Sequence, residues 1–194
     1  MPINYDPDKH ARRSIRLPEY DSTYRGAYAI TLCTYQRECF LGVVVNGEMI
    51  SNELGLLVKA CWEEIPAHFP NTDLDMFVVM PNHVHGIIVL KDSPNTATNQ
   101  ATTPHVESFG RPVPGSLATI IRSFKSATTR RVNETRNTPK MPVWQRNYYE
   151  AIIRDEDALH RVREYIALNP IRWHEDTEKP QHREGRGTAC RAPT

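Results

Sequence analysis

The chain has 194 residues, of which 39% are hydrophobic and 24% are charged. This length and composition are typical of one globular domain with terminal extensions, and they argue against two large domains. The formal net charge is +1, so any affinity for nucleic acid must come from basic residues gathered on one face. The net charge itself neither supports nor excludes DNA as a ligand.

The sequence gives no sign of export or of a membrane anchor. No basic stretch followed by an apolar stretch opens the chain, and the apolar run over residues 76–81 is far shorter than the roughly 18 residues of a membrane span. The four cysteines form no CxxC pair, which argues against an all-cysteine zinc site. We therefore expect a cytoplasmic protein that is not integral to a membrane.

Composition divides the chain into three parts. Residues 1–25 form a basic N-terminal arm without a helical or strand period, and residues 174–194 form a polar, charged tail that we expect to be disordered. Residues 26–173 carry the periodic patterns of a folded domain. Within that domain, residues 91–115 are rich in Ser, Thr, Asn and Pro, which predicts a flexible insertion.

The first half of the domain predicts a strand, a hairpin and a helix. Residues 27–34 alternate and are rich in β-formers, and a turn divides the two short apolar runs of 42–50. Apolar residues then recur at helical spacing over 54–65, with Ser51 or Asn52 as the candidate cap.

The second half adds three strands and two helices. Residues 74–80 and 83–90 predict adjacent antiparallel strands, 117–131 an amphipathic helix, 148–154 a strand, and 155–169 a last helix. The order strand, helix, strand, strand, helix, strand, helix predicts an α+β fold. We expect an antiparallel sheet with helices on one face, the split βαβ or ferredoxin-like arrangement.

Two histidines begin the strand predicted over 83–90. Because strand side chains alternate in direction, His83 and His85 project from one face while Val84 turns to the core. Two imidazoles on one face can share a metal ion. The alternative is a chance pair of exposed histidines, and a metal site needs a further ligand.

Tyr165 and Asn169 lie four residues apart on the last predicted helix, so the phenol and the amide share a face. They supply a candidate nucleophile and an oxygen ligand. The alternative is structural: Tyr165 completes the apolar stripe of the helix, and Asn169 ends it before Pro170.

Together these two pairs suggest phosphoryl-transfer chemistry. A phenol with a reference pKa of about 10 is a poor nucleophile at neutral pH, but a divalent cation can polarise a phosphodiester and stabilise developing charge. Attack by tyrosine conserves the ester energy in a phosphotyrosine, so a free 3′-hydroxyl can reverse the step. Such chemistry favours strand transfer over degradation.

Several segments resemble one known family. VVMPNHVHGIIVL (78–90) and VWQRNYYEAIIRDEDALHRVREYIALNPIRW (143–173) look like the HUH tyrosine transposase superfamily, where U is a hydrophobic residue. Within it the chain most resembles the REP-associated tyrosine transposases, and RRSIRLPEYD, NELGLLVKACW and IIRSFKSATTRR extend the similarity over residues 11–173. The resemblance implies an RRM-like HUH endonuclease fold and action on hairpin-bearing, single-stranded repeat DNA.

The resemblance also assigns roles. It makes His83 and His85 the metal ligands, Asn169 the further ligand and Tyr165 the nucleophile that forms a 5′-phosphotyrosine. It implies Mg²⁺ or Mn²⁺, although imidazole ligands suit Zn²⁺, Mn²⁺ or Ni²⁺ at least as well as Mg²⁺. It is compatible with a monomer or a homodimer.

Basic residues supply candidate contacts to the DNA backbone, which Arg and Lys bind without reading its sequence. The alternative for each of them is a solvated surface charge. The candidates are Arg12, Arg13, Arg16, Arg122, Lys125, Arg130, Arg131 and Arg146. Trp144 and Gln145 are further candidate contacts, with Trp144 equally suited to anchor the core.

Three alternatives to this mechanism remain open. Tyr148 and Tyr149 are rival nucleophiles, but they lie on a predicted strand without an amide four residues on. A metal-dependent hydrolase would attack with water and leave Tyr165 structural. A non-catalytic nucleic-acid-binding module would keep the ferredoxin-like sheet without cleavage.

Overall fold

The structure, a computed structural model, describes residues 25–91 and 113–173. The N-terminal arm with Arg12, Arg13 and Arg16, most of the predicted insertion and the C-terminal tail lie outside the described residues. The elements in chain order are β1 (Gly26–Cys33), the 3₁₀ turn η1 (Tyr35–Arg37), β2 (Gly42–Val45), β3 (Glu48–Ser51), α1 (Glu53–Glu63), α2 (Ile65–His68), β4 (Thr72–Met80), β5 (His83–Leu90), α3 (Leu117–Arg136), β6 (Tyr149–Ile153) and α4 (Glu156–Leu168).

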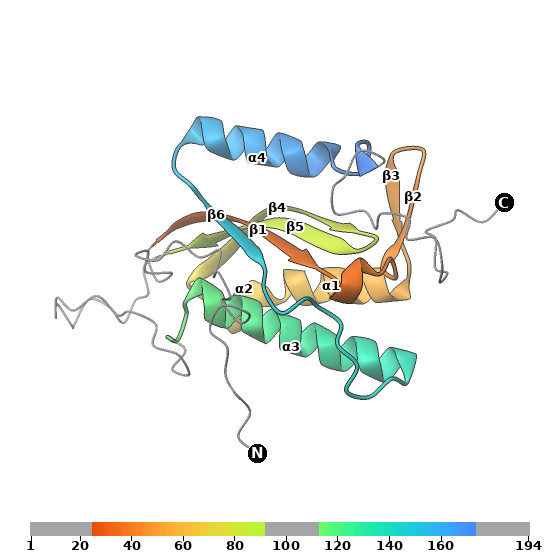
Figure 1. The fold of residues 1–194 in the computed structure, drawn as a ribbon. Coiled ribbons are helices and arrows are strands. Elements are labelled where there is room, and N and C mark those ends of the chain that lie inside the picture. The colour runs from red at the N-terminus through yellow and green to blue at the C-terminus, as the bar shows by residue number, and fades with distance from the viewer. Residues whose placement is uncertain (1–24, 92–112, 174–194) are drawn as a thin grey trace, which may run out of the picture.

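Four strands form the main sheet in the order β4-β5-β1-β6, and every neighbouring pair is antiparallel. A separate two-stranded sheet pairs β2 with β3. The connections from β1 to β4 and from β5 to β6 run through α1 and α3, which gives the split βαβ topology (Figure 1). The predicted α+β fold with an antiparallel sheet is confirmed.

Side-chain caps begin the three long helices at the residues that local chemistry favours. Asn52 is the cap of α1, because its Oδ1 accepts from the Gly55 amide at 3.0 Å. Asp155 Oδ1 accepts from the Ala158 amide at 2.7 Å at the start of α4, and Ser116 caps α3. None of the helices in residues 25–91 and 113–173 combines the length and the apolar character needed to cross a membrane.

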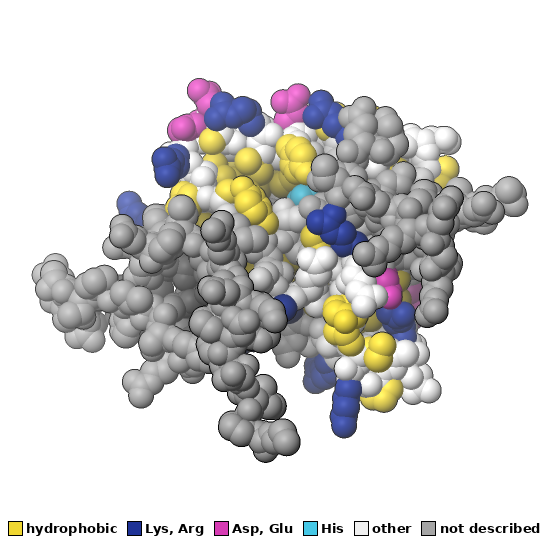
Figure 2. Space-filling model, viewed as in Figure 1, with side chains coloured by type: hydrophobic (Ala, Val, Ile, Leu, Met, Phe, Trp, Pro, Cys, Tyr) yellow, Lys and Arg dark blue, Asp and Glu magenta, His cyan; other side chains and the backbone are white. Residues whose placement is uncertain are grey.

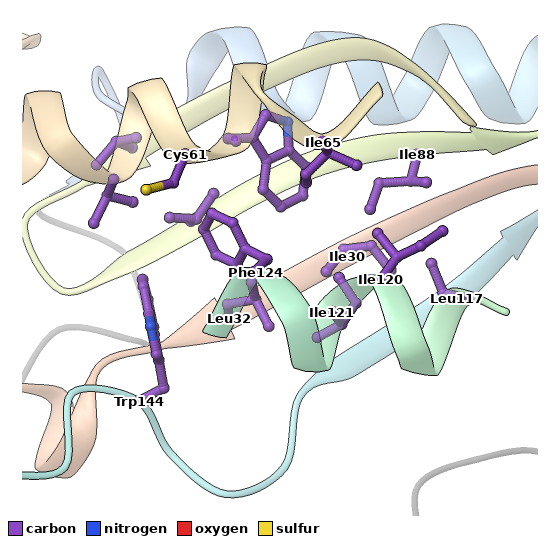
Figure 3. Packing of buried hydrophobic residues seen from close by; sticks show 14 of the residues in the cluster. Ile30, Leu32, Cys61, Ile65, Ile88, Leu117, Ile120, Ile121, Phe124 and Trp144 are labelled. Atoms are coloured by element: carbon purple, nitrogen blue, oxygen red, sulfur yellow. The ribbon is translucent and has the colours of Figure 1, made fainter. Parts of the chain in front are cut away.

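The main core lies between one face of the sheet and the pair α1 and α3. Trp62 of α1 is fully buried, and its ring meets Phe124 of α3 edge to face with centroids 5.3 Å apart. Figure 3 shows side chains of α1, α3 and the strands converging in this layer. Trp144 closes one end, where its Nε1 donates to Thr128 Oγ1 at 2.7 Å, so its role in the core is confirmed.

The placement of helices differs in part from the expectation of helices on one face. The crossover helices α1 and α3 share a face, whereas α4 lies on the opposite side of the sheet (Figure 1). The strand alternation explains the difference, because Val84 is buried in the main core while the flanking residues of β5 point the other way, toward α4. The second face of the sheet is therefore available to form a site under α4.

Gly86 of β5 should tolerate no side chain. A Cβ there would overlap the Trp62 ring, which lies against the strand at this position. We expect Gly86→Ala to lower the free energy of unfolding by about 1–3 kcal/mol because the added methyl overpacks the core. Urea unfolding of Gly86→Ala in the wild-type and Trp62→Phe backgrounds measures the effect. An equal cost in both backgrounds would contradict the clash with the indole ring.

Candidate active site

His83 and His85 lie side by side at the start of β5, with ring centroids 4.5 Å apart. Their side chains are 0% and 5% exposed, so the alternative of an exposed chance pair is wrong. Val84 between them is fully buried on the opposite face. The two rings thus form a buried pair directly below α4.

Each imidazole is oriented through its Nδ1 atom. His83 Nδ1 lies 2.8 Å from Asn82 Oδ1, and His85 Nδ1 lies 2.8 Å from Thr31 Oγ1 on the adjacent strand β1. Asn82 is itself fixed, since its Nδ2 donates to the Arg37 carbonyl at 3.2 Å. Both Nε2 atoms are therefore directed toward α4, in the manner of histidines whose second nitrogen is held by a neighbour.

The last helix brings Tyr165 and Asn169 to these two nitrogens. Asn169 Oδ1 lies 3.3 Å from His83 Nε2, and the Tyr165 hydroxyl lies 3.3 Å from His85 Nε2. Asn169 is buried, whereas Tyr165 is 47% exposed, so Tyr165 is not a core residue of the apolar stripe. A single chain contributes all four side chains.

An ion pair joins α4 to β4 at the edge of the sheet. Arg163 makes two hydrogen bonds to Asp75 of β4, Nε to Oδ1 at 3.0 Å and Nη2 to Oδ2 at 2.6 Å. The hydrogen bonds from Arg163 lower the pKa of Asp75. Asp75 lies where the β4–β5 register shifts between Leu74 and Phe77, so a β-bulge carries the carboxylate that contacts α4.

Burial lowers the pKa of His83 to about 4, so the ring is neutral at pH 7 and has one N–H. The oriented Asn82 carbonyl oxygen accepts that N–H, which leaves a lone pair on Nε2 facing Asn169 Oδ1. His83 Nε2 and Asn169 Oδ1 are thus two acceptors 3.3 Å apart, an arrangement that suits two ligands of one cation. The residues present thus fit a divalent cation.

The ligand set differs from a cluster of acidic or sulfur ligands. Within the described ranges 25–91 and 113–173, no three His, Cys, Asp or Glu side chains gather at one point. The candidate set consists of two imidazoles and the Asn169 amide, with the Tyr165 hydroxyl beside it. Imidazole and carbonyl oxygen ligands together suit first-row divalent ions such as Mn²⁺.

The structure adds neighbours that the sequence patterns did not single out. Thr31 and Asn82 orient the imidazoles, the positive charge of Arg37 contributes to the low pKa of His83, and Trp173 lies with its ring 5.9 Å from His83. Only the strand pairing of β1 with β5, which places Thr31 opposite His85, could have identified the first of them.

The two rival tyrosines lie at the start of β6, with Tyr149 as its first residue and Tyr148 directly before it. Tyr149 is 52% exposed on the α4 side, and Tyr148 packs against the main core. Tyr165 is the tyrosine whose hydroxyl contacts an imidazole of the pair. This geometry favours Tyr165 as the nucleophile.

Known proteins are similar to this chain both in sequence and in fold. A Haemophilus influenzae protein described only as uncharacterized is 41% identical over 179 residues, which are 91% of this chain and 97% of that protein. The chain belongs to the family of that protein. No family model matches the chain.

Solved structures are similar to this chain in fold. A REP-associated tyrosine transposase solved bound to a REP hairpin matches with a TM-score of 0.50 and 17% identity, over 77% of this chain and 71% of that one. A Deinococcus radiodurans protein proposed to be a transposase matches with a TM-score of 0.43 and 19% identity, over 78% of this chain and 94% of that one. This member of the Haemophilus protein's family has the fold of the REP-associated tyrosine transposase.

The basic residues of α3 divide into two groups. Arg122, Lys125 and Arg130 line an open groove of about 800 Å³ along the outer side of the helix, on the sheet face opposite α4. Figure 2 shows Lys and Arg side chains at the lower part of the molecule, where α3 lies, and a mixture of basic and acidic side chains along α4.

The remaining basic candidates have different surroundings. Arg131 donates to both carboxylate oxygens of Glu64, at 3.1 and 2.9 Å, so it joins α3 to α1 and does not line the groove. Lys125 Nζ donates to the carbonyls of Gln145 and Arg146, and burial lowers its pKa to about 8. Arg146 is exposed in the segment before β6.

The neutral state of His83 should make the fold sensitive to acid. Because its folded pKa is about 4 against a reference of 6.5, the unfolded chain binds the proton first as the pH falls. Because of His83, the free energy of unfolding should fall as the pH is lowered from 6.5 to 4, by up to about 3 kcal/mol in all. Above pH 6.5 His83 should have no such effect.

Urea unfolding in a chelator at pH 7 and pH 4.5 measures this loss. His83→Asn, which keeps an N–H near Asn82, should lose less stability than the wild type over that interval. The exposed His160 on the same helix as Tyr165 provides the control, and His160→Asn should lose as much as the wild type. An identical loss in His83→Asn would contradict the role of His83.

Proposed function

We propose that this protein is a metal-dependent endonuclease and strand transferase for single-stranded DNA, an HUH single-tyrosine transposase. The observation that carries the proposal is the Tyr165 hydroxyl 3.3 Å from Nε2 of His85, beside the His83 and Asn169 pair. The fold shared with a REP-associated tyrosine transposase supports it.

In the proposed reaction the Tyr165 oxygen attacks the phosphorus of a phosphodiester. A bond forms between that oxygen and phosphorus, the bond from phosphorus to the 3′ oxygen breaks, and the phenol proton is balanced by protonation of the released 3′-hydroxyl. The Tyr165 oxygen lies 3.3 Å from His85 Nε2, so the nucleophile starts beside the proposed ligand set. A 3′-hydroxyl that attacks the 5′-phosphotyrosine reverses the step and joins strands.

Residues His83, His85 and Asn169 would hold the cation, which we propose to be Mg²⁺ or Mn²⁺. When bound, the ion polarises the phosphodiester and stabilises the charge that develops on its oxygens. The protein contributes the orientation of this set, because Thr31 and Asn82 fix the rings and the pair of Arg163 with Asp75 fixes the helix. Burial keeps the His83 imidazole neutral, as a ligand must be.

The proposed substrate is single-stranded DNA that carries hairpin repeats, as the REP hairpin bound to the structural relative suggests. Arg122 and Arg130 on the α3 groove are proposed as backbone contacts. Arg146, which precedes β6 and whose carbonyl accepts from Lys125 of the groove, is a further proposed contact. We extend the proposal to the arginines of the N-terminal arm, Arg12, Arg13 and Arg16. Arg131 is the weakest of the candidates because Glu64 already binds it.

Tyr165→Phe should abolish covalent attachment to DNA while leaving the fold and DNA binding intact, because only the hydroxyl is removed. The assay incubates wild type and variant with labelled single-stranded hairpin oligonucleotides and Mn²⁺ or Mg²⁺, followed by a denaturing gel and peptide mapping of the adduct. Tyr35, which is 40% exposed, provides the control variant Tyr35→Phe, which should form the adduct normally.

The other outcomes separate the rival functions. Cleavage without an adduct in the wild type would support a hydrolase that uses water. Hairpin binding with neither cleavage nor adduct would support the non-catalytic binding module. An adduct that persists in Tyr165→Phe would move the nucleophile to another tyrosine.

Thr31→Val should weaken cation binding about 10- to 100-fold, because His85 loses the partner that orients its ring. Titration of the chelator-stripped protein with Mn²⁺, followed by calorimetry or by the Mn²⁺ resonance signal, measures the affinity. Thr72→Val is the matched control, since the buried Thr72 hydroxyl has no hydrogen-bond partner. Equal affinities in the two variants would contradict the orienting role of Thr31, and a wild type that binds no Mn²⁺ would contradict the metal site.

A further inference from the structure

A cavity of about 290 Å³ opens beside the Tyr165 hydroxyl, between β1, β6 and α4. Register places Tyr149 opposite Thr31 and Thr31 opposite His85, so these three residues form one row across the sheet. Tyr165 and His85 line the cavity at one end of this row, and Tyr149 lines it at the other. A ligand in the cavity would therefore touch the candidate nucleophile.

The floor of the cavity is flat and apolar because small residues meet there. Ala29 of β1 pairs directly with Ala151 of β6, and Ala158 of α4 lines the same space. Larger side chains at these positions would fill it. Such a floor between an aromatic ring and a helix suits a flat, partly apolar group.

The rim supplies an aromatic face and a cation. Tyr149 is 52% exposed although it lies on a strand of the main sheet, so ring surface remains available to a ligand. Arg161 lines the cavity one helical turn before Tyr165, and no ion pair holds its guanidinium within the described ranges. Residues at this spacing on a helix are about 6 Å apart, so Arg161 and Tyr165 can meet neighbouring groups of one ligand.

We propose that this cavity binds the nucleotide next to the phosphodiester that Tyr165 attacks. Its base stacks on Tyr149 over the alanine floor, and a phosphate of the same strand pairs with Arg161. The volume is just below the roughly 300–1,000 Å³ of small-molecule pockets, which suits one nucleotide and not a longer segment. The inference rests on the proposed function and adds a subsite to it.

Unpaired bases offer a π-face to aromatic side chains, and arginine binds phosphate with paired N–H groups. The cavity combines both requirements within reach of the nucleophile, which neither the α3 groove nor the imidazole pair does alone. A nucleotide held there would position the adjacent phosphodiester against the Tyr165 oxygen. The subsite would thus contribute both to affinity and to the choice of the bond that is cleaved.

The first test needs no cleavage. Protein labelled with 3-fluorotyrosine is titrated with dAMP, dGMP, dCMP and dTMP, and ¹⁹F resonances of Tyr149 and Tyr165 are assigned by their loss in the phenylalanine variants. At least one nucleotide should shift both resonances in a saturable manner. Absence of any shift with all four nucleotides at millimolar concentrations would overturn the subsite, whether or not the protein cleaves DNA.

Variants show whether the nucleotide occupies this cavity. Tyr149→Ala should weaken binding, followed through the Tyr165 resonance, by at least about fivefold, whereas Tyr149→Phe should keep it within about twofold because the ring remains. Ala158→Leu in α4 and Ala151→Leu in β6 should each block binding, because the larger side chain fills the cavity. If one of these variants does not fold, the other still provides the test. Arg161→Ala should weaken binding because the phosphate loses its cation. The control Lys59→Ala, on the exposed side of α1, should leave binding unchanged. Undiminished binding in the folded leucine variants would overturn the assignment.

A second test uses DNA. Hairpin oligonucleotides with an abasic site at successive unpaired positions are bound to Tyr165→Phe protein, and the affinity is measured by fluorescence anisotropy. One position should show a loss of affinity that is absent in the Tyr149→Ala, Tyr165→Phe double variant, since the same contact is removed twice. Equal losses in both proteins at every position would contradict stacking on Tyr149. Because neither protein in this test has Tyr165, the result is independent of the proposed catalytic step.

Discussion

The alternation of side chains along β5 is the constraint on which the rest of the structure depends. Val84 and Gly86 face the main core, where Trp62 leaves no room for a side chain at Gly86, and His83 and His85 face the other side. A shift of one residue in the pairing of β5 would place the imidazoles in the apolar core and the valine under α4. Packing of the core therefore fixes the direction of the histidines, and the stability of the fold and the geometry of the site are set by the same strand.

The second face of the sheet becomes a site only because α4 returns over it after the last strand. The contacts that complete the site join residues 80 and 86 positions apart in the sequence, and the pair of Arg163 with Asp75 joins residues 88 positions apart. Such long-range contacts make the position of Tyr165 and Asn169 dependent on the bulge in β4. The helix is polar on its outer side and contributes few fully buried residues, with Ile166 the buried residue among those of α4. The attachment of α4 to the sheet therefore depends on a small number of specific interactions. The position of this helix, which carries the proposed nucleophile, can change without disturbing the main core.

Some basic side chains form ion pairs that join elements of the fold, and others line the surface. Although the net charge is only +1, the basic residues have two kinds of surroundings. Arg131 and Arg163 form ion pairs with Glu64 and Asp75. Arg122 and Arg130 line an open groove. The groove and the imidazole pair lie on opposite sides of the sheet. A nucleic acid that reaches both must pass an edge of the sheet, and β6 is the edge strand that lies next to β1 and carries Tyr149. The proposed nucleotide subsite lies at this edge, beside the candidate nucleophile.

The sequence alone determined the six strands and the three long helices, though not η1 or α2. It also determined the direction of the two histidines and the spacing of Tyr165 and Asn169, because these follow from local periods and caps that operate within a few residues. It also selected the four side chains that lie together in the structure. Only the tertiary structure decided that α4 covers the face opposite α1 and α3, that Arg131 is held by Glu64, and that Thr31 orients His85. These features depend on pairing between strands and on contacts between distant segments, for which a period of 2 or 3.6 residues carries no information. The cavity beside Tyr165 belongs to the same class, since its alanine floor exists only where β1 and β6 are in register.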